Sequence, residues 1–293
     1  MKVKEKLRIY RALSLLPEGL SKEILRLAEG RKDGPSGIRE IRVRREGVSS
    51  LLLSGESIRL YYRVGREETE ALMEKLVDGA LYAHRDGIAS GYICLDGGIR
   101  VGICGSARYD GERLVGVGDM RSLLFRIPTG ECAFADEIAR IFRSGVRSGM
   151  LIYSPPGVGK TTALRSLALS LGGGAQPIRV AVVDERCEFS EEDYAGREVD
   201  ILKGYKRRSG IEIATRTMSP ELIMIDEIGA DDAEALIGVV RCGIPLVATA
   251  HAASLDELMS KRSLAPLFSC GVFDTLVGIS LSEGKYRLTV DRI

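Results

Sequence analysis

The chain contains few of the residues on which several classes of function depend. Among its 293 residues there are no tryptophans, six phenylalanines and two histidines, His84 and His251. The lack of aromatic stacking platforms weakly disfavours a surface for single-stranded nucleic acid. No apolar run approaches the roughly 18 to 20 residues of a membrane span, and no signal-peptide core follows Met1. We therefore expect a soluble protein, which can still dock on a membrane through other proteins.

Charge and cysteine usage narrow the classes further. The formal net charge is +1, so the chain as a whole has no electrostatic reason to bind nucleic acid or an anionic membrane, although a local basic face could bind either. The cysteines are isolated within apolar segments, with no C-x-x-C pair, which is typical of buried thiols in a reducing cytosol rather than of metal or disulfide sites. They are Cys94, Cys104, Cys132, Cys187, Cys242 and Cys270.

One short stretch, SPPGVGKTT, predicts a phosphate-binding loop. A P-loop reads G-x-x-x-x-G-K-[ST]; its backbone N–H groups cradle phosphates, its Lys reaches the β- and γ-phosphates, and its Ser/Thr hydroxyl ligates Mg²⁺. Lys160 and Thr161 fill the last two roles, and Ser154 replaces the opening glycine. That position mainly ends a strand, so a small Ser followed by two rigid prolines can occupy it. The predicted nucleotide-binding residues are Ser154, Pro155, Pro156, Gly157, Val158, Gly159, Lys160, Thr161 and Thr162.

The surroundings of the loop favour this interpretation over a surface turn. The apolar run MLIYS precedes it, and TTALRSLALSL follows with apolar residues at helical spacing until the glycines from Gly172. A strand, a loop and a helix in this order direct the N–H groups and the positive end of the helix dipole at bound phosphates.

The segments after the loop predict a parallel sheet. Three short β-branched runs, residues 178–185, 221–227 and 244–251, alternate with predicted helices at 211–218 and 233–242. Such runs suit strands buried on both faces. Strands that alternate with helices imply right-handed crossovers, with ligands bound at the carboxyl ends of the strands.

All three runs end in polar residues. The run LIMIDE has the form of a Walker B strand, in which Asp226 holds Mg²⁺ together with Thr161 and Glu227 can polarise the attacking water. The run VVDERCE places Glu185 and Glu188 at a second strand end, and ATAHAAS places Thr249 and His251 at a third. A lone histidine at a strand end is more often structural than catalytic.

The order of these motifs resembles the secretion-superfamily ATPases of type II and type IV systems, with their acidic and histidine boxes. By this resemblance His251 is a candidate catalytic residue, as are Lys160 and the acids. Within them, the chain resembles the stage III sporulation protein AA family in GYICLDGGIRVGICGSA, SPPGVGKTTALRSLA, VVDERCE, GYKRRSGIEIATRTMSPELIMIDEIG and ATAHAAS. The resemblance extends from about Ile38 to the C-terminus. It departs at Ser166, where the family favours Asp, and at Val158; neither position contacts phosphate.

The resemblance implies a function that composition and spacing do not. It implies a Mg-dependent ATPase that forms a ring, a homo-hexamer, with ATP between subunits. It further implies that the ring energises a channel or secretion complex between mother cell and forespore together with membrane-embedded partner proteins. The location implied is cytoplasmic, peripherally associated with a membrane complex on the mother-cell side of the forespore membrane.

The first half of the chain predicts a separate, smaller α+β domain, residues 1–145, before a RecA-like P-loop domain, residues 146–293. A helix is expected at 21–30 with Ser21 as its N-cap and another at about 67–82. The segment IREIRVRREG predicts a strand with Ile41 and Val43 inward, and YICLDGGIRVGICG predicts a hairpin.

Several basic residues have two interpretations. Arg42, Arg44 and Arg45 form either a solvated strand face or a surface for a subunit, another partner or nucleic acid. By resemblance, Arg100 and Arg126 are candidates for arginines that complete the site of a neighbouring subunit, and ordinary salt bridges are the alternative.

The catalytic base has more than one candidate. Glu227 is our choice, and Glu185 or Glu188 of the acidic box is the rival. Arg216, just before the Walker B strand, can sense nucleotide or pair with these acids. A ring motor is the preferred function and a nucleic-acid-handling P-loop ATPase is the alternative; stimulation of hydrolysis by single-stranded DNA or RNA would distinguish them.

Overall fold

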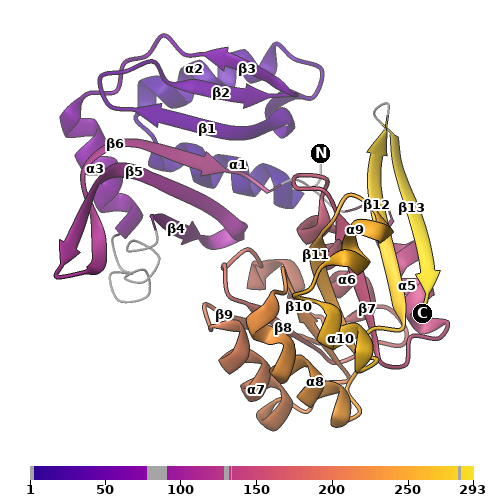
Figure 1. Cartoon of the computed structure of the whole chain (residues 1–293). Helices are drawn as coiled ribbons and strands as arrows, with labels where there is room; N and C mark the ends of the chain where they lie inside the picture. The colour runs from indigo at the N-terminus through magenta and orange to yellow at the C-terminus, as the bar shows by residue number, and fades with distance from the viewer. Residues whose placement is uncertain (1–2, 78–90, 129–131, 133, 283–284) are drawn as a thin grey trace. The chain divides into compact units, whose positions relative to one another are not determined.

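The computed structural model describes residues 3–77, 91–128, 132, 134–282 and 285–293. It divides into two units, Met1–Thr129 and Gly130–Ile293, which are described separately (Figure 1). No helix within the described ranges is long and apolar enough to cross a membrane.

The first unit is an antiparallel six-stranded sheet with helices. The strand order is β3-β2-β1-β6-β5-β4. The strands are β1 (Ile38–Arg44), β2 (Ser50–Leu53), β3 (Glu56–Arg59), β4 (Tyr92–Leu95), β5 (Ile99–Asp110) and β6 (Arg113–Arg126), and the helices are α1 (Val3–Leu15), α2 (Glu18–Glu29) and α3 (Arg66–Val77).

One face of this sheet forms the core of the unit. Ile41 and Val43 are fully buried, and helices α1, α2 and α3 contribute apolar side chains to the same cluster. Arg42 and Arg44 alternate with the buried residues on β1 and are only partly buried, as the period of two predicts. The predicted α+β domain and the inward side chains of β1 are therefore confirmed.

One helix start in this unit differs from the prediction, and another agrees with it. Helix α2 begins at Glu18 after Pro17, and the Ser21 hydroxyl donates to the Leu13 carbonyl oxygen at 2.7 Å, so Ser21 is not the N-cap. Helix α3 begins at Arg66; residues 78–82 of the predicted helix lie outside the described residues.

The second unit is a mainly parallel sheet of seven strands between helices. The order is β13-β12-β7-β11-β10-β8-β9, and β13 alone runs antiparallel to its neighbour among these strands. The strands are β7 (Gly149–Ser154), β8 (Val180–Asp184), β9 (Val199–Lys203), β10 (Leu222–Ile225), β11 (Leu246–His251), β12 (Thr275–Ser282) and β13 (Lys285–Arg292), and the helices are α5 (Ala135–Arg143), α6 (Lys160–Leu171), α7 (Arg207–Thr217), α8 (Ala233–Arg241), α9 (Leu255–Ser260) and α10 (Ala265–Ser269).

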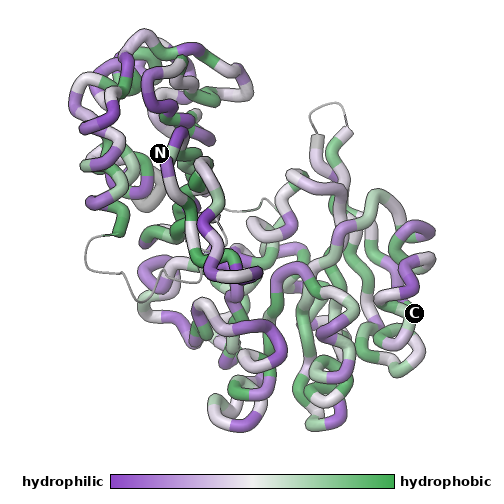
Figure 2. The backbone as a smooth tube through the Cα atoms, turned by 60° about the vertical axis from the view of Figure 1, so that its left-hand side comes forward, coloured by the Kyte–Doolittle hydropathy of each residue, from purple (hydrophilic) through white to green (hydrophobic). Residues whose placement is uncertain are grey.

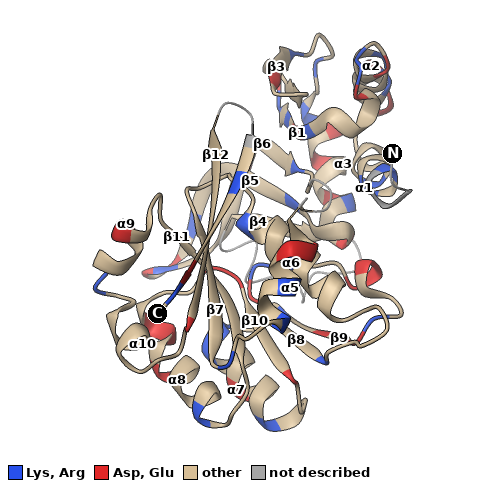
Figure 3. Ribbon diagram, turned by 90° about the vertical axis from the view of Figure 1, so that its right-hand side faces the viewer, with Lys and Arg blue, Asp and Glu red and all other residues tan. Residues whose placement is uncertain are grey.

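Alternate residues of the central strands enter two cores. Met150 and Ile152 of β7 pack with α5 and α6, whereas Leu151 and Tyr153 pack in the cluster of α7 and α8. The central strands β7, β8, β10 and β11 are buried almost throughout, and green, hydrophobic segments run through this unit in Figure 2. Charged residues lie mainly on helices, loops and the outer strand β13 (Figure 3). A sheet buried on both faces is the predicted α/β architecture.

The domain boundary lies earlier than the expected position between residues 145 and 146. Ile138 and Phe142 of α5 are buried in the same core as Leu164 and Leu167 of α6. Because this packing ties α5 to the P-loop helix, the second unit includes it and begins at Gly130.

Helix α7 begins at Arg207 rather than at residue 211. Its first turn is polar and contains Gly210, which conceals the helical pattern. A Cβ at Gly210 would approach Cγ1 of Val183 to 2.5 Å, so glycine permits close packing of the helix on β8.

The cysteines are less buried than expected. Cys94 is buried, whereas Cys132 and Cys187 are partly buried and Cys104, Cys242 and Cys270 are exposed. Cys187 lies in a turn, and Cys242 and Cys270 lie at the ends of α8 and α10. At such positions a neighbouring apolar run does not imply burial.

Candidate active site

The P-loop connects β7 to the start of α6. Gly157 and Gly159 have φ angles of +77° and +111°, in the left-handed region that side chains other than glycine rarely adopt. Ser154 instead ends β7 as strand, is buried, and its hydroxyl donates to the Pro155 carbonyl oxygen at 2.9 Å. The opening position therefore does not need the conformational freedom of glycine.

Lys160 is buried beneath this loop. Its Nζ donates to the carbonyl oxygens of Ser154 at 3.1 Å and Pro155 at 3.3 Å, and lies 2.8 Å from Nδ1 of His251. Burial lowers the pKa of the Lys160 ammonium, which the charges of Asp226 and Glu227 partly offset.

The contact with Lys160 defines the tautomer of His251. A lysine ammonium has donors and no acceptor, so Nδ1 accepts and the ring proton resides on Nε2. Nε2 lies 2.9 Å from Oε1 of Glu227 and donates to it. His251 therefore links the P-loop lysine to the Walker B glutamate.

Asp226 is held by two threonine hydroxyls. Thr161, in the first turn of α6, donates to Oδ2 at 2.7 Å, and Thr249 of β11 donates to Oδ1 at 2.5 Å. Strand β11 lies between β7 and β10, so Thr249 bridges the strands that carry the two motifs.

These groups fit a magnesium ion. The Thr161 hydroxyl and the Asp226 carboxylate supply oxygen donors at one point, and Mg²⁺ is commonly bound by one or two protein oxygens together with phosphates and water.

Glu227 is held on both sides of its backbone. Its φ of +56° is unusual for a residue other than glycine. Its N–H donates to the Thr249 hydroxyl at 2.8 Å, and its carbonyl oxygen accepts from Nη1 of Arg207 at 2.8 Å. The carboxylate is paired with Arg186 as well as with His251. These contacts set the direction of the side chain.

The acidic box joins the same cluster. Asp184 accepts the backbone N–H groups of Glu188 and Phe189, both at 2.9 Å. Burial raises the Asp184 pKa to about 6, although these hydrogen bonds act to lower it. Glu185 pairs with Arg207 at 3.3 Å, and the Glu188 carbonyl oxygen accepts from Arg165 at 3.3 Å.

Arg216 is not part of this cluster. It lies exposed in the last turn of α7, about two and a half turns beyond Arg207, which does contact the acids. The prediction relied on the position of Arg216 just before the Walker B strand. A residue that precedes β10 lies near the amino end of that strand, whereas Asp226 and Glu227 follow its carboxyl end.

Sequence reasoning missed three contributors, Arg186, Arg207 and Asp232, and it placed Thr249 at a strand end without assigning it a role. Asp232 pairs with Arg207 at 3.1 Å and accepts from the Gly229 N–H at 2.8 Å. Arg186 and Arg207 lie inside quoted motifs; for Arg186 the neighbouring Glu185 is a signal, and for Arg207 the sequence offers none.

Arg100 and Arg126 lie opposite each other on β5 and β6 of the first unit. Arg126 pairs with Glu40 at 3.5 Å, and the Arg100 guanidinium lies 3.9 Å from the centroid of the Tyr92 ring. Within this unit both arginines therefore have local partners.

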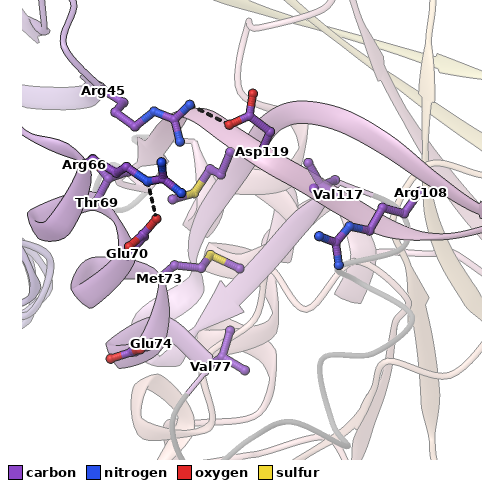
Figure 4. Close-up of a pocket in the computed structure, with 12 residues that line it drawn as sticks. Arg45, Arg66, Thr69, Glu70, Met73, Glu74, Val77, Arg108, Val117 and Asp119 are labelled. Atoms are coloured by element: carbon purple, nitrogen blue, oxygen red, sulfur yellow. Dashed lines mark hydrogen bonds and ion pairs between the residues drawn. The ribbon is translucent and has the colours of Figure 1, made fainter.

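A cavity of about 810 Å³ lies beside α3 and the β5–β6 hairpin in the first unit (Figure 4). Arg45 pairs with Asp119 at 2.6 Å and Arg66 with Glu70 at 2.8 Å in its wall. Because these charges neutralise one another, the wall defines no particular ligand chemistry.

The second unit, with its glycine-rich loop at a helix start and acids at neighbouring strand ends, is a RecA-like P-loop domain. The chain belongs to the family described as sporulation stage III, protein AA, whose model matches residues 11–288. The resemblance carried by the motifs is thereby confirmed.

Known proteins agree with this assignment. The chain is 28% identical over 257 residues to stage III sporulation protein AA of Bacillus subtilis, covering 84% of each chain. Its fold resembles the Legionella pneumophila ATPase DotB, with a TM-score of 0.62, 14% identity and coverage of 94% of this chain and 81% of that one. It also resembles the pilus retraction motor PilT with bound ADP, with a TM-score of 0.62, 14% identity and coverage of 92% and 81%.

Proposed function

We propose that this protein is a Mg-dependent ATPase that forms a ring motor and energises a sporulation channel or secretion complex. The proposal rests on the hydrogen-bonded chain that connects Lys160, His251 and Glu227. Beside it, Thr161 at the start of α6 contacts Asp226, which follows β10. Family membership and the names of the fold relatives, an ATPase and a retraction motor, support the proposal.

Each side chain has a defined part in this reaction. The loop N–H groups and Lys160 bind the phosphates, and Thr161 with Asp226 would hold Mg²⁺. Magnesium, when bound, would neutralise charge that develops on the phosphates. Glu227 polarises and orients the attacking water, and His251 holds its carboxylate in place. Glu185, paired with Arg207, is the rival base.

The proposed assembly is a homo-hexamer that binds ATP between its subunits. In it, Arg100 or Arg126 completes a neighbouring subunit's site, and membrane-embedded proteins anchor the ring at the mother-cell side of the forespore membrane. An arginine supplied in trans stabilises charge on the γ-phosphate. The cytoplasmic location belongs to the same proposal.

Replacement of the P-loop lysine tests the proposal. We expect Lys160→Ala to reduce phosphate release from Mg·ATP by about 100-fold or more, because the charge that meets the phosphates is lost. Lys22→Ala, at an exposed lysine paired with Glu18, is the matched control and should hydrolyse ATP normally. Equal thermal unfolding would establish that both variants fold. Undiminished turnover by folded Lys160→Ala would refute the site.

The nucleic-acid alternative draws on one feature of the first unit. The register places Arg42 of β1 and Arg100 of β5 on the sheet face opposite the core. Tyr92 of β4 lies on the same face, and its ring contacts Arg100. Such a face can contact phosphates and stack a base. Single-stranded DNA or RNA that accelerates hydrolysis several-fold would favour this alternative over the motor.

A further inference from the structure

The carboxylate of Glu227 is engaged at both of its oxygens. Oε1 accepts from Nε2 of His251 at 2.9 Å, and Oε2 is paired with the Arg186 guanidinium. A base that polarises water needs negative charge available on one of these oxygens. While it is paired with Oε2, the Arg186 guanidinium reduces the negative charge that Glu227 can offer to water.

The loop that carries Arg186 is anchored on both sides. Before it, Asp184 ends β8 and binds two backbone N–H groups of the loop. After it, Phe189 is fully buried and stacks on Tyr194 with ring centroids 6.1 Å apart. Cys187 adopts a φ of +54° in this turn. The backbone of the loop is therefore held in place, and it presents the Arg186 side chain to Glu227.

Two arginines divide the contacts with Glu227. Arg207 binds its carbonyl oxygen and also pairs with Glu185 and Asp232. Arg186 pairs with the carboxylate itself, and its side chain is 42% exposed. Arg207 holds the backbone, whereas Arg186 contacts the charge and can leave toward solvent.

We propose that Arg186 is a positioning residue that restrains Glu227 and holds basal hydrolysis low. Water is polarised by Glu227 during the fraction of time in which the pair with Arg186 is open. The inference rests on the proposed ATPase function and concerns the regulation of that site.

Steady-state kinetics of Arg186 variants test the restraint. With saturating Mg·ATP, Arg186→Ala and Arg186→Gln should raise kcat by about threefold or more, a small part of the roughly 10²- to 10⁴-fold that a general base contributes. KM should change little, because the restraint acts on Glu227, which orients water, and the P-loop that binds the phosphates is unchanged. Arg186→Lys, which keeps the charge, should return kcat toward wild type. A merely structural role would not raise kcat.

Arg179→Ala is the matched control. Arg179 precedes the first residue of β8, at the end of the strand opposite to Arg186, and pairs with Glu221 at 3.4 Å. Its side chain is exposed like that of Arg186, so its loss should leave kcat unchanged.

A double variant shows whether Arg186 acts through Glu227. In a Glu227→Gln background, Arg186→Ala should have no effect on the residual single-turnover rate, because coupled residues are not additive. An equal increase in that background would overturn the restraint. A loss of kcat in Arg186→Ala and Arg186→Gln would also overturn it and would place the guanidinium on the phosphates. If the wild type and all Arg186 variants neither bind nor hydrolyse ATP, the proposed function itself fails.

Discussion

Thr249 allows the strongest test of how the two motifs are connected. Its hydroxyl donates to Asp226 at 2.5 Å and accepts from the Glu227 N–H at 2.8 Å, and the side chain is fully buried. Thr249→Val keeps the shape and removes both hydrogen bonds. Thr249→Ser keeps both and removes one methyl group.

The structure sets the expected size of the difference. In Thr249→Val, the Glu227 N–H loses its partner, which costs about 1–3 kcal/mol, and Asp226 loses one bond to a charged group, which costs about 1.5–3 kcal/mol. Because Asp226 keeps its bond to Thr161, we expect a total of about 2–4 kcal/mol. For a unit of this size the loss corresponds to a fall in Tm of roughly 5–15 °C. Thr249→Ser should cost about 1 kcal/mol.

Thermal unfolding and phosphate release together measure the effect. Both the Tm and the ATPase rate should decrease in the order wild type, Thr249→Ser, Thr249→Val, because the strained Glu227 backbone loses an anchor. If Thr249→Val is as stable as the wild type, or more stable than Thr249→Ser, the hydroxyl does not bridge the motifs and the reasoning is wrong.

Three other predictions concern the same site. Glu227→Gln should bind fluorescent ATP but release phosphate at least about 100-fold more slowly, since a base contributes roughly 10²- to 10⁴-fold; wild-type turnover there, with loss in Glu185→Gln, would assign the base to the acidic box. Mixing Lys160→Ala with Arg126→Ala subunits should restore some hydrolysis if the arginine acts in trans, and unchanged activity of Arg126→Ala alone would contradict that role. Burial raises the Asp184 pKa from its ordinary 3.8 to about 6, so the native state binds more protons than the unfolded chain and stability falls as pH rises through that window. The Tm of Asp184→Asn relative to the wild type should therefore rise between pH 4 and 6 and level off above it, and a flat difference would argue against the shift.

Local patterns predicted most of the second unit. The strands at 178–185, 221–227 and 244–251 contain β8, β10 and β11, because short β-branched runs suit a sheet covered on both faces. Helix starts were less accurate where polar first turns or a glycine broke the apolar period, as at Gly210. In the first unit, α1 was not predicted. The outer part of the long β5–β6 hairpin was not predicted either, because its exposed strands lack the alternation of apolar and polar residues that burial of one face imposes.

The sequence by itself determined the components of the candidate site, because the loop with Lys160 and the Asp226–Glu227 pair are contiguous motifs that follow the ends of apolar strands. Only the tertiary structure decided which partners these groups meet. Strand order placed β11 between β7 and β10, and it thereby brought Thr249 to Asp226 and His251 between Lys160 and Glu227. The sequences of short apolar strands do not specify which strands will be neighbours in the sheet, so contacts between residues at different strand ends follow from the packing of the whole unit.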